Sequence, residues 1–197
     1  MAGPLDDQSL EWLERTFGPL PDLLVETGTG YGQTAYWAMT HFRLVRSVEL
    51  SRDLHAQALA AGFGPNVELF SGDSADQLPR MLADSPWRDS PVLFYLDAHW
   101  SGGMAGRGQD DCPLLRELRV IRDRPCPDVI VCDDVRMFGL RGEAGLPGSE
   151  QYPLHDFDWS TVTVETCREI LGPDTIEREA LAADRFIVRR TNRNSAG

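Results

Sequence analysis

Short apolar runs alternate with amphipathic segments along most of the chain. The apolar runs are typical of strands buried in a sheet, and the intervening segments place apolar residues at helical spacing. Strands are predicted over residues 23–25, 44–50, 67–70, 91–96, 128–132, 175–181 and 186–190. Helices are predicted over residues 5–17, 34–42, 53–61, 74–82, 112–121 and 162–171. The stretch 139–158, rich in Gly, Pro and acidic residues, is predicted to be a loop.

This alternation predicts an α/β fold with a doubly wound, mostly parallel seven-stranded sheet and a C-terminal antiparallel hairpin. The 197 residues suit one domain, which we expect over 21–197, preceded by an N-terminal helix within 1–20. In such sheets ligands bind beyond the carboxyl ends of the strands. Acidic residues gather at those predicted ends: Glu26, Glu49, Asp73, Asp97, Asp133 and Asp134.

Composition narrows the possible partners. The chain has 31 acidic and 19 basic residues and a formal net charge of −12, so its field repels phosphate backbones and we expect no nucleic-acid partner. No apolar run reaches about 18 residues, so no membrane span is predicted. The N-terminal stretch lacks the basic and apolar regions of a signal peptide, and the four cysteines are scattered. We therefore expect reduced thiols and a cytoplasmic location.

A glycine-rich turn follows the first predicted strand, in the run VETGTGYG from Val25 to Gly32. Glycines there let the backbone turn sharply and let a ligand approach closely. About twenty residues later, Glu49 can accept two hydrogen bonds from a ribose diol. Gln33 stands where a dinucleotide-binding G-x-G-x-x-G loop has glycine. The acidic Glu26 also suits a cationic amine or sulfonium better than a pyrophosphate.

The E-x-G-x-G-x-G motif, the acid closing the second strand, Gly72-Asp73-Ser74 and the expected strand order together resemble the class I S-adenosylmethionine-dependent methyltransferases. The resemblance spans residues 20–190 and implies a Rossmann-like methyltransferase fold that binds S-adenosylmethionine. It implies that Glu26, Gly28 and Gly30 hold the amino-acid part of the cofactor. It further implies that Glu49 binds the ribose hydroxyls and that Asp73, flanked by Ser74, accepts from the adenine amino group.

Three carboxylates follow the fourth and fifth predicted strands, at Asp97, Asp133 and Asp134. They could surround one Mg²⁺, which prefers oxygen ligands. This layout resembles the metal-dependent catechol-type and macrocin-type O-methyltransferases, in which the metal coordinates two neighbouring oxygens of the acceptor and lowers the pKa of a hydroxyl. Two other interpretations stay open. Asp133 and Asp134 could cap the following turn, and Asp97 could contact only the cofactor.

His99 lies two residues after Asp97 and is a candidate general base, metal ligand or polar wall residue. We take His99 and Asp97 as the candidate catalytic residues, and His155 is a weaker candidate. Trp100 could stack on an acceptor or simply pack. The glycine-rich segment 101–109 could close over bound substrate or be a flexible connection.

The leading hypothesis is an S-adenosylmethionine-dependent O-methyltransferase, assisted by Mg²⁺, acting on a hydroxyl of a small acceptor. The acceptor is expected to be a sugar, nucleoside or natural product, as in natural-product or polysaccharide biosynthesis, and the enzyme could be a homodimer. A nicotinamide-dependent oxidoreductase is one alternative, although Gln33 and the absence of lysine weigh against its common short-chain form. A non-catalytic S-adenosylmethionine-binding module is the other.

Overall fold

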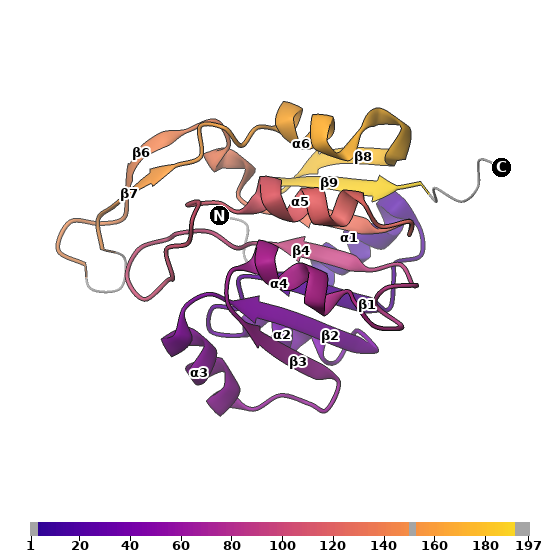
Figure 1. The fold of residues 1–197 in the computed structure, drawn as a ribbon, viewed down its shortest axis with the longest axis horizontal. Coiled ribbons are helices and arrows are strands. Elements are labelled where there is room, and N and C mark those ends of the chain that lie inside the picture. Colours follow the sequence, from indigo (N-terminus) through magenta and orange to yellow (C-terminus); the bar gives the residue numbers. More distant parts are fainter. Residues whose placement is uncertain (1–3, 150–152, 192–197) are drawn as a thin grey trace.

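A seven-stranded sheet forms the centre of the protein in the computed structural model, which describes residues 4–149 and 153–191 (Figure 1). The strand order is β3-β2-β1-β4-β5-β9-β8, and the first five strands are parallel. Strand β9 runs antiparallel to both β5 and β8. The strands are β1 (Leu23–Thr27), β2 (Leu44–Glu49), β3 (Val67–Ser71), β4 (Leu93–Leu96), β5 (Val129–Cys132), β8 (Ile176–Ala182) and β9 (Arg185–Arg190). The predicted fold class is confirmed.

Six α-helices flank the sheet within the described ranges: α1 (Asp7–Phe17), α2 (Gln33–Ala38), α3 (Arg52–Ala61), α4 (Ser74–Met81), α5 (Leu114–Arg122) and α6 (Val164–Leu171). Short 3-10 turns occupy η1 (Val135–Met137) and η2 (Pro173–Thr175). None of the helices in the described part of the chain is long and apolar enough to cross a membrane.

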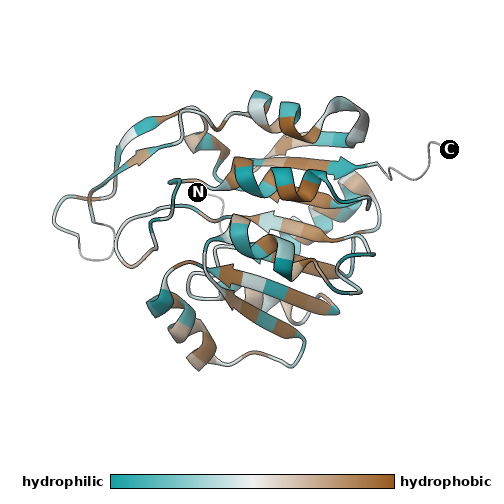
Figure 2. Ribbon diagram, viewed as in Figure 1, coloured by the Kyte–Doolittle hydropathy of each residue, from teal (hydrophilic) through white to brown (hydrophobic). Residues whose placement is uncertain are grey.

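The sheet separates two hydrophobic cores, because successive side chains of a strand point to opposite faces. On β4, Phe94 packs into the core shared with α4, α5 and α6, whereas Leu93 and Tyr95 pack into the core shared with α1 and α2. Hydrophobic residues accordingly concentrate on the strands in Figure 2. The predicted N-terminal helix packs directly on the sheet through Leu13 and Phe17. Residues 1–3 of that segment and 192–197 of the predicted domain lie outside the described residues.

The prediction of a loop over 139–158 was wrong for eight residues. Strands β6 (Arg141–Ala144) and β7 (His155–Asp158) pair antiparallel there as a separate two-stranded sheet. Both strands are mostly polar and largely exposed, so they lack the apolar alternation that marks a half-buried strand. The hairpin extends from the body of the protein beside the segment that follows β4 (Figure 1).

Candidate active site

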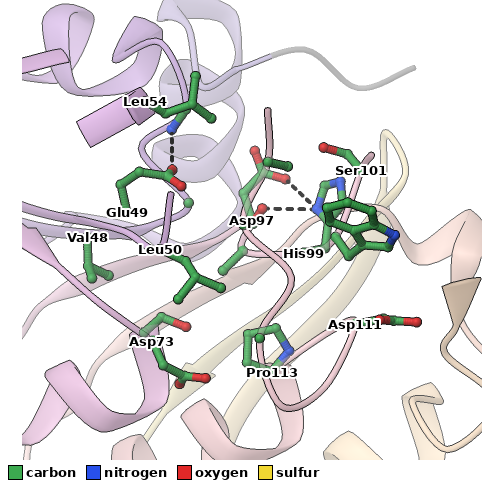
Figure 3. A pocket seen from close by; sticks show the side chains of 18 of the residues that line it. Val48, Glu49, Leu50, Leu54, Asp73, Asp97, His99, Ser101, Asp111 and Pro113 are labelled. Carbon is green, nitrogen blue, oxygen red and sulfur yellow. Dashed lines mark hydrogen bonds and ion pairs between the residues drawn. The ribbon is translucent and has the colours of Figure 1, made fainter. Parts of the chain in front are cut away.

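A cavity of about 200 Å³ lies at the carboxyl ends of β1 to β4, below the segment 98–113. Figure 3 shows Glu49 and Asp73 on one side of it and Asp97 with His99 on the other. Most of the residues predicted to bind the cofactor line this cavity: Gly28, Gly30, Glu49, Asp73, Ser74 and Asp97. The structure therefore brings together residues that lie up to 69 positions apart in the sequence, from Gly28 to Asp97.

Glu49, the last residue of β2, is held in place by the main chain. Its Oε2 accepts the Gly30 N–H at 2.8 Å, and its Oε1 accepts the Ser51 N–H at 2.7 Å. Each carboxylate oxygen can accept a further hydrogen bond. Main-chain N–H groups of Gly30 and Ser51 thus hold the Glu49 carboxylate at the cavity wall, where its two oxygens could accept from a vicinal diol.

Two glycines of this turn serve different purposes. A Cβ on Gly28 would lie 2.8 Å from the Asp97 carbonyl oxygen, so glycine allows the turn to lie directly against the end of β4. Gly30 has a φ of +54°, and a Cβ there would meet no atom within 4 Å. The turn therefore leaves open space beside Glu49.

Glu26 lies beneath the cavity and not at its wall. It is 2% exposed, and its Oε2 accepts the Ser47 hydroxyl at 2.6 Å. Burial raises the pKa of Glu26 to about 8, although the Ser47 and Thr34 hydroxyls favour the charged form. Its predicted contact with the amino-acid part of the cofactor stays a prediction.

Asp73 caps the N-terminus of α4 and is already engaged by protein partners. Its Oδ1 accepts the Ala75 N–H at 3.0 Å, and its Oδ2 accepts from Arg116 at 3.0 Å. The neighbouring Ser74 hydroxyl donates to Glu117, a buried carboxyl whose pKa burial raises to about 7. Sequence reasoning missed Arg116 and Glu117, because helix α5 meets α4 only in the tertiary structure.

The cavity wall is strongly acidic. Besides Glu49, Asp73 and Asp97, it includes Asp110 and Asp111. Among the described residues that line it, none is Arg or Lys. Arg116 pairs with Asp73 and Asp110, and Arg107 pairs with Asp111, so Glu49 and Asp97 are the wall carboxylates without an arginine partner among the described residues. These two favour a cationic ligand group over a pyrophosphate.

At the ends of β4 and β5 the structure assembles Asp97, His99 and Asp134, whose potential ligand atoms lie within 4.8 Å of one another. The His99 Nδ1 lies 3.0 Å from the Asp97 main-chain oxygen, and the His99 Nε2 lies 3.4 Å from Asp134 Oδ2. Burial, reinforced by the nearby carboxylates of Asp133 and Asp134, raises the pKa of Asp97 well above its usual range. Asp134 is also paired with Arg136, whose Nη1 lies 2.5 Å from Asp134 Oδ1.

Asp133, the third predicted metal ligand, is not in this cluster. Its Oδ2 accepts the Tyr95 hydroxyl at 2.5 Å, and its Oδ1 lies 3.5 Å from the Arg185 Nε. Asp133 therefore points into a buried network on the α1 side of the sheet. The sequence could not show this, because Tyr95 and Arg185 lie on other strands, far from Asp133 in sequence.

The segment 98–113 is tied down over the cavity. Arg107 donates to Asp111 within the segment and to Asp156 on hairpin β6–β7, with distances of 2.7–3.1 Å. Its guanidinium also lies 5.5 Å from the centre of the Trp100 ring. A Cβ on Gly106 would lie 2.7 Å from Leu50, so glycine lets the segment rest on the cavity rim.

His155, the weaker candidate, lies on β7 against Trp100, with 5.7 Å between ring centres. Its Nδ1 lies 3.0 Å from the Pro153 carbonyl oxygen. It belongs to the hairpin contact with Trp100 and not to the cluster of Asp97, His99 and Asp134.

No protein-family model matches the sequence, and no curated protein matches it. Solved structures do match. A candidate rRNA methylase from Clostridium thermocellum is 12% identical, with a TM-score of 0.54 over 93% of this chain and 96% of that one. A candidate O-methyltransferase from Klebsiella pneumoniae is 18% identical, with a TM-score of 0.52 over 98% of this chain and 83% of that one. A candidate S-adenosylmethionine-dependent methyltransferase from Listeria monocytogenes is 13% identical, with a TM-score of 0.51 over 92% of this chain and 96% of that one.

The chain has the class I methyltransferase fold. The resemblance found in its motifs is confirmed at the level of the fold. In this class I methyltransferase fold, the acidic cavity lies at the carboxyl ends of the parallel strands, where doubly wound sheets bind their ligands. At these identities the likeness concerns the fold, and the chemistry has to be argued from the site.

Proposed function

We propose that the protein is an S-adenosylmethionine-dependent O-methyltransferase that acts on a hydroxyl of a small acceptor. The acidic cavity carries this proposal. Glu49 presents two fixed oxygens for a ribose diol, and the wall offers carboxylates and no Arg or Lys among its described residues. A cationic sulfonium suits this wall, whereas the pyrophosphate of a nicotinamide cofactor would face Glu49 with no arginine lining the cavity among the described residues.

The cluster at the ends of β4 and β5 supports a divalent cation, which the sequence predicts to be Mg²⁺. Two carboxylates and one imidazole converge there, with potential ligand atoms within 4.8 Å of one another, although Arg136 also pairs with Asp134. Asp97, His99 and Asp134 would hold the ion. When bound, a divalent cation lowers the pKa of a coordinated hydroxyl and so makes it a better nucleophile.

The protein itself must orient the cofactor and the acceptor. Methyl transfer requires the acceptor oxygen to lie in line with the sulfonium methyl group, so both partners must be oriented. Glu49 would orient the cofactor through its ribose, and the segment 98–113, tied by Arg107 to Asp111 and Asp156, would position the acceptor above it.

A small acceptor fits this protein better than RNA. The likeness to an rRNA methylase concerns the fold alone, at 12% identity. The chain carries a formal charge of −12, which opposes a phosphate backbone. The acceptor is proposed to be a sugar, nucleoside or natural product, recognised by segment 98–113 and the residues after β5.

Calorimetry separates the proposed function from the oxidoreductase alternative. We expect S-adenosylmethionine and S-adenosylhomocysteine to bind with a stoichiometry of one and NAD⁺ not to bind. Transfer of a labelled methyl group to a panel of sugars, nucleosides and catechols then tests for turnover. Binding of NAD⁺ without S-adenosylhomocysteine would overturn the proposal. Cofactor binding without transfer to any hydroxylated acceptor would favour the non-catalytic binding module.

A further inference from the structure

Hairpin β6–β7 is covered along one of its two edges. On the β7 side, the Trp100 indole N–H donates to the Asp156 main-chain oxygen at 3.1 Å, and the Asp158 N–H donates to Asp111 at 2.9 Å. The main chain of β7 is therefore tied to segment 98–113. Strand β6 forms the other edge of a hairpin that extends away from the central sheet (Figure 1), and three of its four residues are exposed.

The register of the hairpin shows which main-chain groups of β6 face this outer edge. In an antiparallel pair, residues that exchange hydrogen bonds alternate with residues whose N–H and C=O groups point away from the partner strand. Asp156 and Asp158 use these groups outside the hairpin, so the residues opposite them, Glu143 and Arg141, also point theirs outward. Within residues 4–149 and 153–191, no group bonds to the main chain of Arg141 or Glu143 on that side. The β6 edge is therefore open to another strand.

The sequence along this edge is complementary to itself. From Leu140 to Ala144 it reads apolar, positive, glycine, negative, apolar. An antiparallel second copy centred on Gly142 would place Arg141 opposite Glu143 of that copy, and Leu140 opposite its Ala144, each twice. The charged pairs would lie on one face and the apolar pairs on the other, because successive residues of a strand point to opposite faces.

The side chains of β6 are available for such a pairing. Within the described part of the chain, neither Arg141 nor Glu143 forms an ion pair, and Leu140 is 50% exposed. Opposite charges that lie directly across two antiparallel strands stabilise the pair. Strand β7 lacks this pattern, because an antiparallel second β7 centred on Phe157 would place Asp156 opposite Asp158. Charge complementarity thus favours a second β6 at the open edge.

We propose that β6 is an interface between two copies of this chain, which pair antiparallel about a two-fold axis at Gly142. The main chains of Arg141 and Glu143 would exchange hydrogen bonds with those of the second copy, and the two hairpins would form one four-stranded sheet. A lone two-stranded hairpin is marginally stable in water, so each hairpin gains from the pairing. Since β7 is tied to segment 98–113, the pairing would also steady that segment over the cavity. The inference is independent of the proposed methyl transfer.

Sedimentation velocity of the protein between about 5 and about 500 µM tests this interface. We use about 0.15 M salt, which screens the long-range repulsion between two chains of charge −12. A four-residue strand buries little area, so we expect a weak dimer that forms within this range. Its sedimentation coefficient should rise with concentration from that of a monomer towards that of a dimer.

Charge reversal identifies the strand and its register. Arg141→Glu and Glu143→Arg should each raise the dissociation constant of the dimer by at least about tenfold, because like charges then face each other twice. A mixture of the two variants should associate within about threefold of the unmodified protein, since opposite charges again meet. Arg15→Glu and Glu14→Arg, at exposed positions of α1, make the same changes in net charge and should leave association unchanged.

A cysteine at the two-fold axis tests the register directly. In the proposed pairing the two Gly142 residues are opposite without exchanging hydrogen bonds, which brings Cα atoms to about 4.5 Å, a distance that a disulfide can span. A Cβ on Gly142 would meet only Phe157, at 3.9 Å, so cysteine fits there, and the four native cysteines are buried. Mild oxidation of Gly142→Cys should give mainly a covalent dimer, whereas Glu14→Cys should stay mainly monomeric.

Three results would overturn this inference. One is a protein that stays monomeric up to about 500 µM. Another is a dimer that both charge reversals leave unchanged, which would place the interface elsewhere. The third is a mixture of the two variants that does not associate, with Gly142→Cys that does not cross-link. Circular dichroism of each variant checks its fold, and S-adenosylhomocysteine binding by the unmodified protein tests the proposed function separately.

Discussion

The two sides of the candidate active site are built in different ways. On the side of β1 to β3, Glu49 and Asp73 end strands or begin helices and accept N–H groups of nearby turns. On the side of β4 and β5, Asp133 is held by Tyr95 of β4 and Arg185 of β9, and Asp134 contacts His99. The carboxylates of the first side are held mainly by main-chain N–H groups, including that of Gly30, whereas Asp133 on the second side is held by side chains that meet it only when β4, β5 and β9 come together. Variants should therefore affect the two sides separately.

Loss of the cation should have the largest effect and should be confined to the β4–β5 side. A chelator should lower methyl transfer by at least about 100-fold, because the acceptor hydroxyl would no longer be activated. Added Mg²⁺ should restore it. Calorimetry on the same sample should show S-adenosylmethionine binding within about twofold of the untreated protein. Full activity in chelator would remove the cation from the proposal.

Glu26, which is buried beneath the β1–β3 side of the cavity, should make the stability of the protein depend on pH. Its pKa is raised from the usual 4.5 to about 8 by burial, so the folded state favours the protonated form. The stability linked to this proton is complete below about pH 4.5 and is lost as the pH rises through 8. Glu26→Gln mimics the protonated form and should be more stable than the unmodified protein at pH 9 by on the order of 3 kcal/mol.

Urea denaturation at pH 5 and pH 9 measures this difference. At pH 5 the two proteins should differ little, since Glu26 is then protonated in the folded state. Glu14→Gln, at an exposed position of α1, is the matched control and should show no such dependence. Equal stability differences at both pH values would show that Glu26 stays charged in the fold.

Glu49→Ala should weaken S-adenosylmethionine binding by about 1–3 kcal/mol, because charge-assisted hydrogen bonds to the ribose are lost. Calorimetry measures the affinity, with Glu11→Ala on the exposed face of α1 as the control. Mg²⁺ affinity should not change, since Glu49 lies on the other side of the cavity from Asp97 (Figure 3). A parallel loss of Mg²⁺ binding would show that the two sides are coupled.

Arg107→Ala should have the smallest effect. Arg107 is partly exposed, and its ion pairs with Asp111 and Asp156 tie segment 98–113 to hairpin β6–β7. Without them we expect faster amide hydrogen exchange in residues 98–113 and an unchanged exchange rate in the sheet. Arg122→Ala, at another surface arginine with a carboxylate partner, is the control. Unchanged exchange in 98–113 would mean that Gly106 and Trp100 hold the segment without Arg107.

The sequence by itself determined the fold class and most of the candidate cofactor-binding residues. Buried strands of a parallel sheet appear as continuous apolar runs, and the ends of such runs must meet at one edge of the sheet. Glu49 and Asp73 could be recognised because each lies at such an end, and Gly28 and Gly30 because the turn after β1 is local. The sequence did not predict hairpin β6–β7, because its strands are mostly polar and largely exposed.

Only the tertiary structure decided which acid of the Asp133-Asp134 pair faces His99. The two residues are adjacent, chemically identical and both at the end of β5, so no local pattern distinguishes them. Their directions are set by Tyr95 on β4 and Arg185 on β9, which engage Asp133, and by the left-handed turn at Asp134. These contacts depend on strand neighbours 38 and 52 residues away from Asp133. Pairing between distant strands is a property of the folded sheet, and it exists only once the chain has folded.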